Sequence, residues 1–202
     1  MTSNASDEPF GDVERILGYR DAVDDSIPLT EVADELVVVS CFTPRFCKAL
    51  IRAAEACGGF GSYASDPVPG NELSLAEISP RLFEMIQNDL GARIWPKLQQ
   101  HWGLIDYHGL NDAFIIKYEQ GAQEELRLHH DVAQVSGSIK LNDEYTGAEL
   151  EFPRQGYSNA ALPIGSLLAW PSLVTHPHRS APITSGTKYS LTLWFELPLR
   201  IG

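Results

Sequence analysis

The chain has 202 residues, of which 15 are Lys or Arg and 27 are Asp or Glu, so its formal net charge is −12 at pH 7. This acidic surplus disfavours nucleic acid as a partner, because a polyanion is bound through basic surfaces. With 44% hydrophobic residues the chain can bury a substantial core, which excludes a wholly disordered protein. The sequence shows neither an apolar run of roughly 18 residues nor a signal-peptide pattern, so we expect no membrane association and a cytoplasmic protein.

The acidic residues are concentrated at the N-terminal end of the chain. Residues 1–35 contain ten Asp or Glu and two Arg. Such a composition favours a solvated segment over a packed one. We therefore expect residues 1–34 to form an acidic, flexible segment, with order starting near Glu35. Residues 35–202 are expected to form a single domain, with helical support over about 35–110 and a β-rich core over about 111–198.

The first predicted elements of this domain are a strand and a helix. An apolar run at 36–42 predicts a buried strand. Thr43 and Pro44 then provide an N-cap and a first-turn proline for a helix over 44–57, and two glycines end it. The three cysteines, at 41, 47 and 57, have no CxxC spacing, so we expect small core residues rather than a disulfide framework or a zinc site.

A loop and a second helical stretch follow. Residues 61–78, GSYASDPVPGNELSLAEI, are predicted to be a loop. From Pro80 to Trp102 apolar residues recur at helical spacing, which predicts a helix, and Pro96 predicts a break or kink within it. We expect both helical stretches to pack against the β-rich core.

From about residue 111 onward, short alternating apolar runs are separated by turn residues. Alternation with a period of two is typical of antiparallel strands that are buried on one face. Runs of this length favour a jelly roll, whose mouth can hold a small ligand. The predicted fold class is therefore mainly β with flanking helices: a double-stranded β-helix (jelly-roll) core supported by N-terminal helices.

Two pairs of histidines lie in this β-rich region. The HxD pattern alone is common by chance, but in the strand LRLHHDV a pleated backbone directs His129 and Asp131 to one side and His130 to the other. His178, 47 residues after Asp131, can supply a third ligand from a distant strand, with His176 as its rival. Two histidines and one carboxylate leave three positions open on iron(II), which suits a bidentate 2-oxo acid and dioxygen.

Further motifs surround these candidates. They are Tyr118-Glu-Gln-Gly121, Leu126-Arg-Leu-His129-His130-Asp131, Leu141-Asn142, Gly147-x-x-x-x-Phe152, Gly165, Trp170-Pro171-Ser172, His178-x-x-x-Pro182 and Gly186-Thr-Lys188-Tyr-Ser190. With these motifs, the stretch from about 112 to 196 resembles the iron(II)- and 2-oxoglutarate-dependent dioxygenases. Within them it is most similar to the prolyl- and lysyl-hydroxylase type.

The resemblance implies a role for several of these residues. His129, Asp131 and His178 would ligate iron(II), which makes them the catalytic centre. Lys188 would hold the 5-carboxylate of 2-oxoglutarate, and the phenol of Tyr118 would donate a hydrogen bond to the 2-oxo acid. Dioxygen would be the second cosubstrate.

The alternation of the last strand supports an inward position for the lysine independently. A period of two places Lys188, Ser190, Thr192 and Trp194 on one face, so a cation and a hydroxyl would point inward together. An inward lysine requires an anion, because an unpaired buried charge is costly. The resemblance implies that this anion is 2-oxoglutarate, so we expect Lys188 and Ser190 to contact it. Lysyl hydroxylases usually present arginine at the position of Lys188, and lysine binds as a point charge rather than a planar fork.

Substrate-binding residues are expected at the mouth of the barrel, where loops concentrate specificity. Arg127 would lie there and either meet an anionic substrate group or pair with Glu125. The loop at 59–78 and the segment after Gly121 would border the substrate. Lys140 is expected to face water.

The implied reaction hydroxylates an unactivated C–H bond of an amino acid, a peptide or a small natural-product intermediate and releases succinate and CO2. Desaturation and ring closure stay open, whereas the retained Asp131 disfavours halogenation. The acidic balance of the chain favours a cationic substrate. Two alternatives remain: a cupin-like metal-dependent isomerase or hydrolase that does not use 2-oxoglutarate, and a non-catalytic jelly-roll binding protein.

Overall fold

The structure is a computed structural model that describes residues 21–62, 68–103 and 106–196. Eight of the described strands form a major antiparallel sheet: β1 (Thr30–Ala33), β2 (Leu36–Ser40), β3 (Glu72–Ser74), β4 (Leu110–Glu119), β6 (Val135–Lys140), β7 (Tyr145–Gly147), β10 (Ser166–Pro171) and β12 (Ile183–Phe195). Their order is β1-β2-β10-β6-β12-β4-β3, and β7 pairs with the first part of β12.

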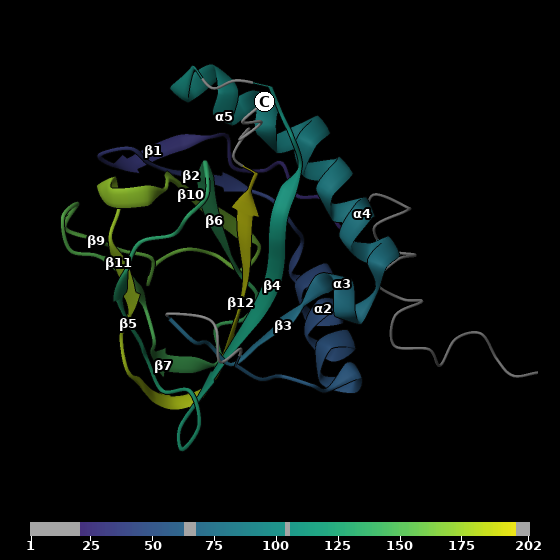
Figure 1. Cartoon of the computed structure of the whole chain (residues 1–202), viewed down its shortest axis with the longest axis vertical. Helices are drawn as coiled ribbons and strands as arrows, with labels where there is room; N and C mark the ends of the chain where they lie inside the picture. The colour runs from purple at the N-terminus through teal and green to yellow at the C-terminus, as the bar shows by residue number, and fades with distance from the viewer. Residues whose placement is uncertain (1–20, 63–67, 104–105, 197–202) are drawn as a thin grey trace, which may run out of the picture.

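A smaller antiparallel sheet lies across from the major sheet (Figure 1). Its strands follow the order β5-β11-β8-β9 and comprise β5 (Leu126–His129), β8 (Leu150–Phe152), β9 (Tyr157–Ser158) and β11 (His178–Ser180). The two sheets form a jelly-roll core with helices outside it. The predicted fold class is therefore confirmed.

Helices cover the outer face of the major sheet (Figure 1). They are α2 (Pro44–Cys57), α3 (Leu75–Ile78), α4 (Pro80–Asp89), the π-helical turn η1 (Leu90–Ile94) and α5 (Trp95–Trp102). As predicted, Thr43 caps α2, because its hydroxyl accepts a hydrogen bond from the Phe46 amide. The π-helical turn ends two residues before Pro96, whose ring nitrogen carries no hydrogen and cannot continue the α-helical bonding pattern.

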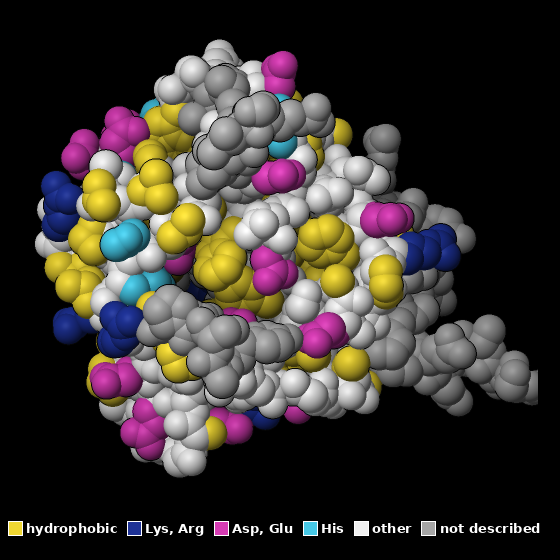
Figure 2. All heavy atoms as spheres, viewed as in Figure 1, with side chains coloured by type: hydrophobic (Ala, Val, Ile, Leu, Met, Phe, Trp, Pro, Cys, Tyr) yellow, Lys and Arg dark blue, Asp and Glu magenta, His cyan; other side chains and the backbone are white. Residues whose placement is uncertain are grey.

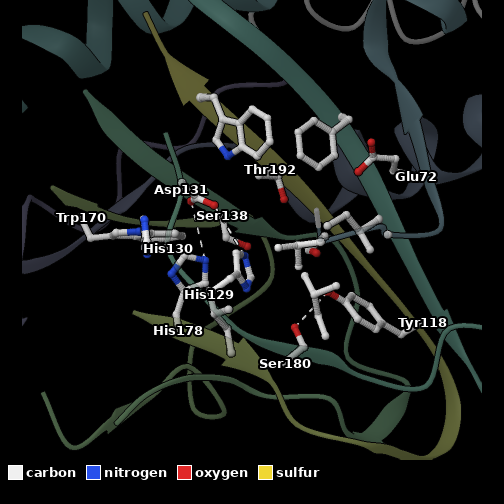
Figure 3. A pocket seen from close by; sticks show the side chains of 18 of the residues that line it. Glu72, Tyr118, His129, His130, Asp131, Ser138, Trp170, His178, Ser180 and Thr192 are labelled. Carbon is white, nitrogen blue, oxygen red and sulfur yellow. Dashed lines mark hydrogen bonds and ion pairs between the residues drawn. The ribbon is translucent and has the colours of Figure 1, made fainter. Parts of the chain in front are cut away.

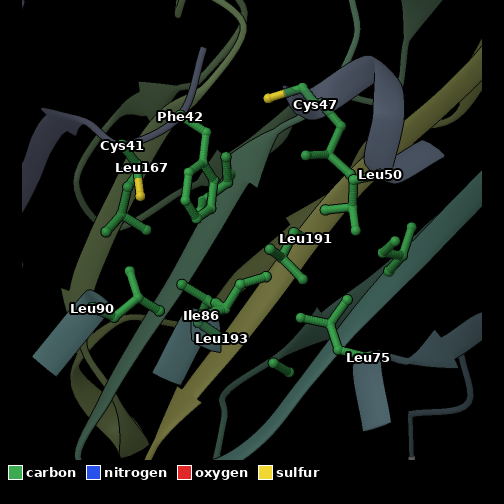
Figure 4. Close-up of a cluster of buried hydrophobic side chains, with 14 of the residues drawn as sticks. Cys41, Phe42, Cys47, Leu50, Leu75, Ile86, Leu90, Leu167, Leu191 and Leu193 are labelled. Carbon is green, nitrogen blue, oxygen red and sulfur yellow. The ribbon is translucent and has the colours of Figure 1, made fainter. Parts of the chain in front are cut away.

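The main hydrophobic core lies between these helices and the major sheet (Figure 4). Leu50 and Ile86 from the helices meet Leu191 and Leu193 from β12, and all four are completely buried. Cys41 and Cys47 are also buried, as predicted, whereas Cys57 is exposed. The prediction for Cys57 is wrong because it is the last residue of α2, where the helix leaves the core.

Two strands of the major sheet, β1 and β3, come from parts of the chain where a flexible segment or a loop was expected. β1 lies within the acidic segment but is ordered through its antiparallel pairing with β2, so this part of the expected flexible segment is corrected; residues 1–20 lie outside the described residues. β3 and α3 lie within the predicted 61–78 loop, since β3 pairs with β4 and Ser74 forms a capping box with Glu77. The jelly roll therefore begins well before residue 111.

Strand β12 lies between the main hydrophobic core and the cavity between the two sheets. The alternation predicted for it is present: the side chains of one set pack in the main core, and those of the other set line a cavity between the two sheets. The first set is Tyr189, Leu191, Leu193 and Phe195, and the second is Lys188, Ser190, Thr192 and Trp194. In the described part of the chain, none of the helices has the length and apolar character needed to span a bilayer.

Candidate active site

A cavity of about 310 Å³ lies between the two sheets. The major sheet and the chain leading into it contribute Val68, Gly70, Glu72, Phe114, Ile116, Tyr118, Ser138, Trp170, Lys188, Ser190, Thr192 and Trp194. The side around the smaller sheet contributes Leu126, His129, His130, Asp131, Val132, Leu150, His178 and Ser180. Six of the seven predicted site residues thus meet in one cavity, and Arg127 does not line it.

His129, Asp131 and His178 form the one group among the described residues that could hold a metal ion (Figure 3). Their candidate ligand atoms all lie within 4.8 Å of one another. The Nε2 atoms of His129 and His178 each lie 3.6 Å from an oxygen of Asp131. Pairing between β5 and β11 sets this geometry, because it places the two histidines directly opposite each other.

Backbone carbonyls determine which nitrogen of each imidazole is free. The Nδ1 atom of His129 lies 2.8 Å from the carbonyl oxygen of Arg127, and that of His178 lies 3.0 Å from the carbonyl oxygen of His176. A carbonyl only accepts, so each Nδ1 carries the hydrogen and each Nε2 turns its lone pair toward Asp131. Burial also lowers the pKa of His178 to about 4, so this lone pair is available at neutral pH.

The carboxylate of Asp131 has an unfilled position. Its Oδ2 atom is buried and has no hydrogen-bond partner among the described residues. Burial acts to raise the pKa of Asp131, but the neighbouring His129, His178 and Ser136 outweigh it, so the pKa is lowered and the group is ionised. A buried, ionised carboxylate that faces two imidazole lone pairs and has an unpartnered oxygen fits a divalent metal ion with two nitrogen ligands and one oxygen ligand.

Strand β5 contains a β-bulge beside this group. His129 pairs with His178 and Leu126 pairs with Ser180, so three steps along β5 match two along β11. Both Leu126 and His129 therefore reach the cavity, whereas Arg127 is exposed and donates to the Leu128 carbonyl at 3.4 Å. Arg127, which was predicted at the mouth, is not among the residues that line the cavity, because counting by two from His129 fails across a bulge.

The two remaining histidines of this region lie outside the metal group. His130 is exposed and lines the outer part of the cavity. His176 is buried, with Nδ1 2.9 Å from Oγ1 of Thr175 and Nε2 3.2 Å from the carbonyl oxygen of Asp34. It joins the turn between β1 and β2 to the segment before β11, which contains the short 3₁₀ turn η2 (Leu173–Thr175).

Lys188 is buried in the same cavity, with 3% of its surface exposed. Its Nζ donates to the carbonyl oxygen of Ala148 at 2.6 Å and lies 4.6 Å from the centre of the Tyr118 ring. Burial lowers the pKa of Lys188 to about 7, although Glu149 acts in the opposite direction. The ion pairs found among the described residues do not include Lys188. Such an ammonium gains from an anionic ligand.

Tyr118 lies opposite Lys188 on the neighbouring strand β4. Its hydroxyl accepts a hydrogen bond from Oγ of Ser180 at 3.0 Å, and burial raises the pKa of Tyr118 to about 12. The phenol therefore keeps its own hydrogen to donate into the cavity. Ser190, the next inward residue after Lys188 on β12, is also buried.

Several lining residues were not singled out from the sequence. Ser180 and Ser138 are small hydroxyls whose inward position depends on long-range strand pairing. Glu72 lies on β3, within the loop that was expected to border the substrate. Lys140, expected to face water, is half-buried outside the cavity, with its Nζ 3.4 Å from the carbonyl oxygen of Ala160. Between Gly121 and the strand β5 no residue lines the cavity.

The fold and the site together define a class of protein: a double-stranded β-helix that carries a two-histidine, one-carboxylate metal site beside a buried lysine. Residues 113–196 match the family described as the 2OG-Fe(II) oxygenase superfamily. The metal of this superfamily is iron(II), and its cosubstrates are 2-oxoglutarate and dioxygen. The donor set described above fits that metal.

The chain is similar to relatives that are described as procollagen lysine hydroxylases. The chain is 30% identical over 181 residues to a "Procollagen lysyl hydroxylase and glycosyltransferase" of Acanthamoeba polyphaga mimivirus. The aligned region covers 80% of this chain and 19% of the relative. A Caenorhabditis elegans "Multifunctional procollagen lysine hydroxylase and glycosyltransferase" is 24% identical over 187 residues, 85% of this chain and 25% of the relative. The chain thus spans at most about a quarter of the length of these two relatives.

A solved structure shows the same fold. The viral collagen prolyl hydroxylase of Paramecium bursaria Chlorella virus-1, in its 2OG complex, superposes with a TM-score of 0.60 at 17% identity. The match covers 81% of this chain and 98% of that protein. This chain therefore shares its fold with that prolyl hydroxylase.

Proposed function

We propose that this chain is an iron(II)- and 2-oxoglutarate-dependent dioxygenase that hydroxylates an unactivated C–H bond of an amino acid, a peptide or a small natural-product intermediate. One observation carries the proposal: a metal-binding triad and a buried lysine that forms no ion pair with the described residues face the same cavity. In the overall reaction, 2-oxoglutarate, dioxygen and a C–H bond give succinate, CO2 and a C–OH bond. A cytoplasmic location stays a prediction.

In this proposal, His129, Asp131 and His178 hold iron(II) through the two Nε2 atoms and the Asp131 carboxylate. The metal with 2-oxoglutarate supplies the activation of dioxygen when both are bound. The protein contributes three fixed ligands whose orientation comes from strand pairing and from the carbonyls behind each imidazole. The aromatic rings of Phe152 and Trp170, 5.3 and 4.9 Å from the His178 ring, restrict its rotation and keep water away.

Lys188 is proposed to hold the 5-carboxylate of 2-oxoglutarate, with Tyr118 and Ser190 as hydrogen-bond donors. The ammonium already has one neutral partner, the Ala148 carbonyl, and keeps two further hydrogens for a carboxylate. The Tyr118 hydroxyl accepts from Ser180 and donates its own hydrogen to the cosubstrate. These three side chains share one end of the cavity, because Lys188 pairs with Tyr118 across β12 and β4.

The position of Lys188 disfavours the two alternatives. An isomerase or hydrolase without 2-oxoglutarate has no anion for this lysine to bind, and the desolvation of its ammonium would then serve no purpose. A non-catalytic binding protein does not require three converging ligand atoms with an unpartnered carboxylate oxygen. The substrate class stays open among amino acids, peptides and small intermediates, and the names of the relatives favour a peptide.

Anaerobic titration tests the proposed function. Adding iron(II) and then 2-oxoglutarate to the metal-free protein should produce a weak visible metal-to-ligand charge-transfer band. Asp131→Ala should lose the band with the metal, and Lys188→Ala should keep the metal but require far more 2-oxoglutarate. A wild-type protein that binds iron(II) yet gives no band with 2-oxoglutarate would contradict the proposal and favour the isomerase or hydrolase.

A further inference from the structure

The cavity reaches the molecular surface beside the metal ligands. Among the described residues that line it, only His130 and Val132 are exposed, and the others are buried or half-buried. These two residues are the chain neighbours of Asp131, in the segment that follows β5. The cavity has a volume of about 310 Å³ and also holds the cosubstrate, so a substrate larger than one side chain extends out of it past these residues.

Apolar side chains lie around this opening. Five large hydrophobic side chains are exposed in the described part of the chain, and four of them come from the two segments that meet at Asp131: Leu128, Val132, Leu173 and Val174. The amide of Leu173 donates to the carbonyl oxygen of Asp131 at 2.9 Å, which places the turn η2 beside Val132. Figure 2 shows hydrophobic side chains grouped beside the histidines, where Figure 1 places β11. We refer to Val132, Leu173 and Val174 as the apolar rim.

The turn that presents two residues of the apolar rim is fixed by hydrogen bonds. Nη1 of Arg154 donates to the carbonyl oxygen of Val174 at 3.0 Å, and Nε2 of Gln155 donates to that of Thr175 at 3.3 Å. Leu173 has a φ of 62°, a left-handed conformation that leucine rarely adopts. The fold therefore holds these apolar side chains in solvent at a cost in backbone strain, and such strain is concentrated at ligand-binding sites.

The apolar rim is continuous with the cavity, because Val132 belongs to both. A group that covers the rim is therefore a part of the substrate that stays outside while another part reaches the metal. A free amino acid has a single side chain, which the cavity takes, whereas a peptide carries a second side chain beside the first. The rim consists of three aliphatic residues, so an aliphatic side chain gains the most by leaving water against it.

We propose that the apolar rim is a docking surface for an aliphatic side chain of a peptide substrate, at a position that directly flanks the residue entering the cavity. This inference rests on the proposed function and adds a sequence preference to it. The flanking side chain packs on Val132, Leu173 and Val174, and the entering side chain passes His130 on its way to the metal.

Paired peptides test this surface: acetyl-Gly-Leu-Xaa-Leu-Gly-amide and acetyl-Gly-Ser-Xaa-Ser-Gly-amide. The central residue is lysine, proline or aspartate in turn, so that a cationic, a neutral and an anionic side chain are each offered to the cavity. Each peptide is titrated anaerobically by calorimetry into the protein loaded with iron(II) and 2-oxoglutarate. With at least one central residue, the leucine peptide should bind about tenfold more tightly than its serine counterpart, because a further aliphatic side chain leaves water.

Two double variants at the same positions show whether the rim causes this preference. Leu173→Asn combined with Val174→Thr makes the turn polar and suits the backbone, because asparagine tolerates a positive φ. This variant should lose the preference for leucine while the charge-transfer band with 2-oxoglutarate stays unchanged. Leu173→Met combined with Val174→Ile is the matched control, since it keeps both positions apolar, and it should keep the preference.

Equal binding of the paired peptides with every central residue, binding of none of them, or a preference that survives the polar double variant would each overturn the assignment. Sedimentation of the wild-type protein as a dimer and of the polar double variant as a monomer would also overturn it, because a second copy of the chain would then occupy the rim. Calorimetry reports the preference without the charge-transfer band. A failure of the proposed function therefore shows as a missing band, and a failure of this inference shows as a missing preference.

Discussion

On one face of β12, Leu191 is completely buried among helix side chains; on the other face, Lys188 is almost as deeply buried but borders a cavity. The two positions are three residues apart and differ in what surrounds them. Carbon atoms fill the space around Leu191, whereas Lys188 has one carbonyl and one ring. Burial alone therefore does not separate structural from functional residues in this strand; the need for a ligand does.

The largest effect is expected on the cavity face, at the metal. Asp131→Ala removes the carboxylate that faces both imidazoles, so iron binding should be lost and succinate formation should fall by about a thousandfold or more. Metal content after iron loading, measured by mass spectrometry, checks this. His130→Ala, which changes a neighbouring exposed histidine, should keep the metal; loss of iron in both variants would mean that the triad is misassigned.

Lys188→Met sharpens the contrast, because it replaces the ammonium with an apolar group of similar length. The affinity for 2-oxoglutarate should fall by about a hundredfold, since a charge-assisted contact is lost in a desolvated site. The melting temperature of the ligand-free protein should stay the same or rise, because burying the lysine is costly. A large drop in melting temperature with unchanged 2-oxoglutarate affinity would make Lys188 a structural residue.

Leu191→Ala should have the opposite effects: it should lower the stability of the protein and leave 2-oxoglutarate binding unchanged. Truncating a completely buried leucine leaves a cavity in the main core, and the free energy of unfolding should fall by about 2–5 kcal/mol. Chemical denaturation measures this change. The charge-transfer band per folded molecule should be unchanged, and a selective loss of 2-oxoglutarate binding would show that the two faces of β12 are not independent.

The pH dependence of cosubstrate binding should follow the protonation of Lys188. Its pKa is lowered to about 7 in the ligand-free protein, and a bound carboxylate favours the charged ammonium. Below pH 7 the lysine is already protonated; above it, binding must take up a proton. The affinity of the iron-loaded protein should therefore fall by up to about tenfold per pH unit above 7, and this slope should be absent in Lys188→Met.

The smallest effect is expected at Tyr118. Removing its hydroxyl in Tyr118→Phe deletes one neutral donor and leaves the ring under the Lys188 ammonium. A single hydrogen bond of about 1 kcal/mol corresponds to about a fivefold weaker affinity for 2-oxoglutarate. Ser180→Ala, which removes the donor to the phenol, should weaken binding by no more than this; a larger loss would place Ser180 itself in contact with the cosubstrate.

The metal triad and the lysine could be predicted because their signals are local. His129 and Asp131 are two residues apart, and Lys188 lies within a long alternating strand, so period-two counting orders their faces. The resemblance then supplied the partnership with His178, which no local rule provides. The same counting failed at Arg127, because an extra residue in β5 breaks the period.

The Glu72 side of the cavity could not be predicted with local rules. β3 has three residues and no alternation of its own, and its position follows from pairing with β4, about 40 residues later in the chain. Likewise, β1 is ordered by its partner β2 and not by its composition. Charge density and turn residues predicted an unstructured chain in both places, and tertiary pairing outweighed those tendencies.

The extra residue in β5 also bears on how this site can change during evolution. Leu126 and His129 both reach the cavity only because Arg127 and Leu128 together occupy one step of the partner strand. Deleting one of these two would leave a regular strand that still presents His129 to His178. Homologous chains can therefore differ in length by one residue here without losing the triad. If an alignment of such chains allows no gap between Leu126 and His129, it places Tyr118 and every other residue before the bulge one position out of register.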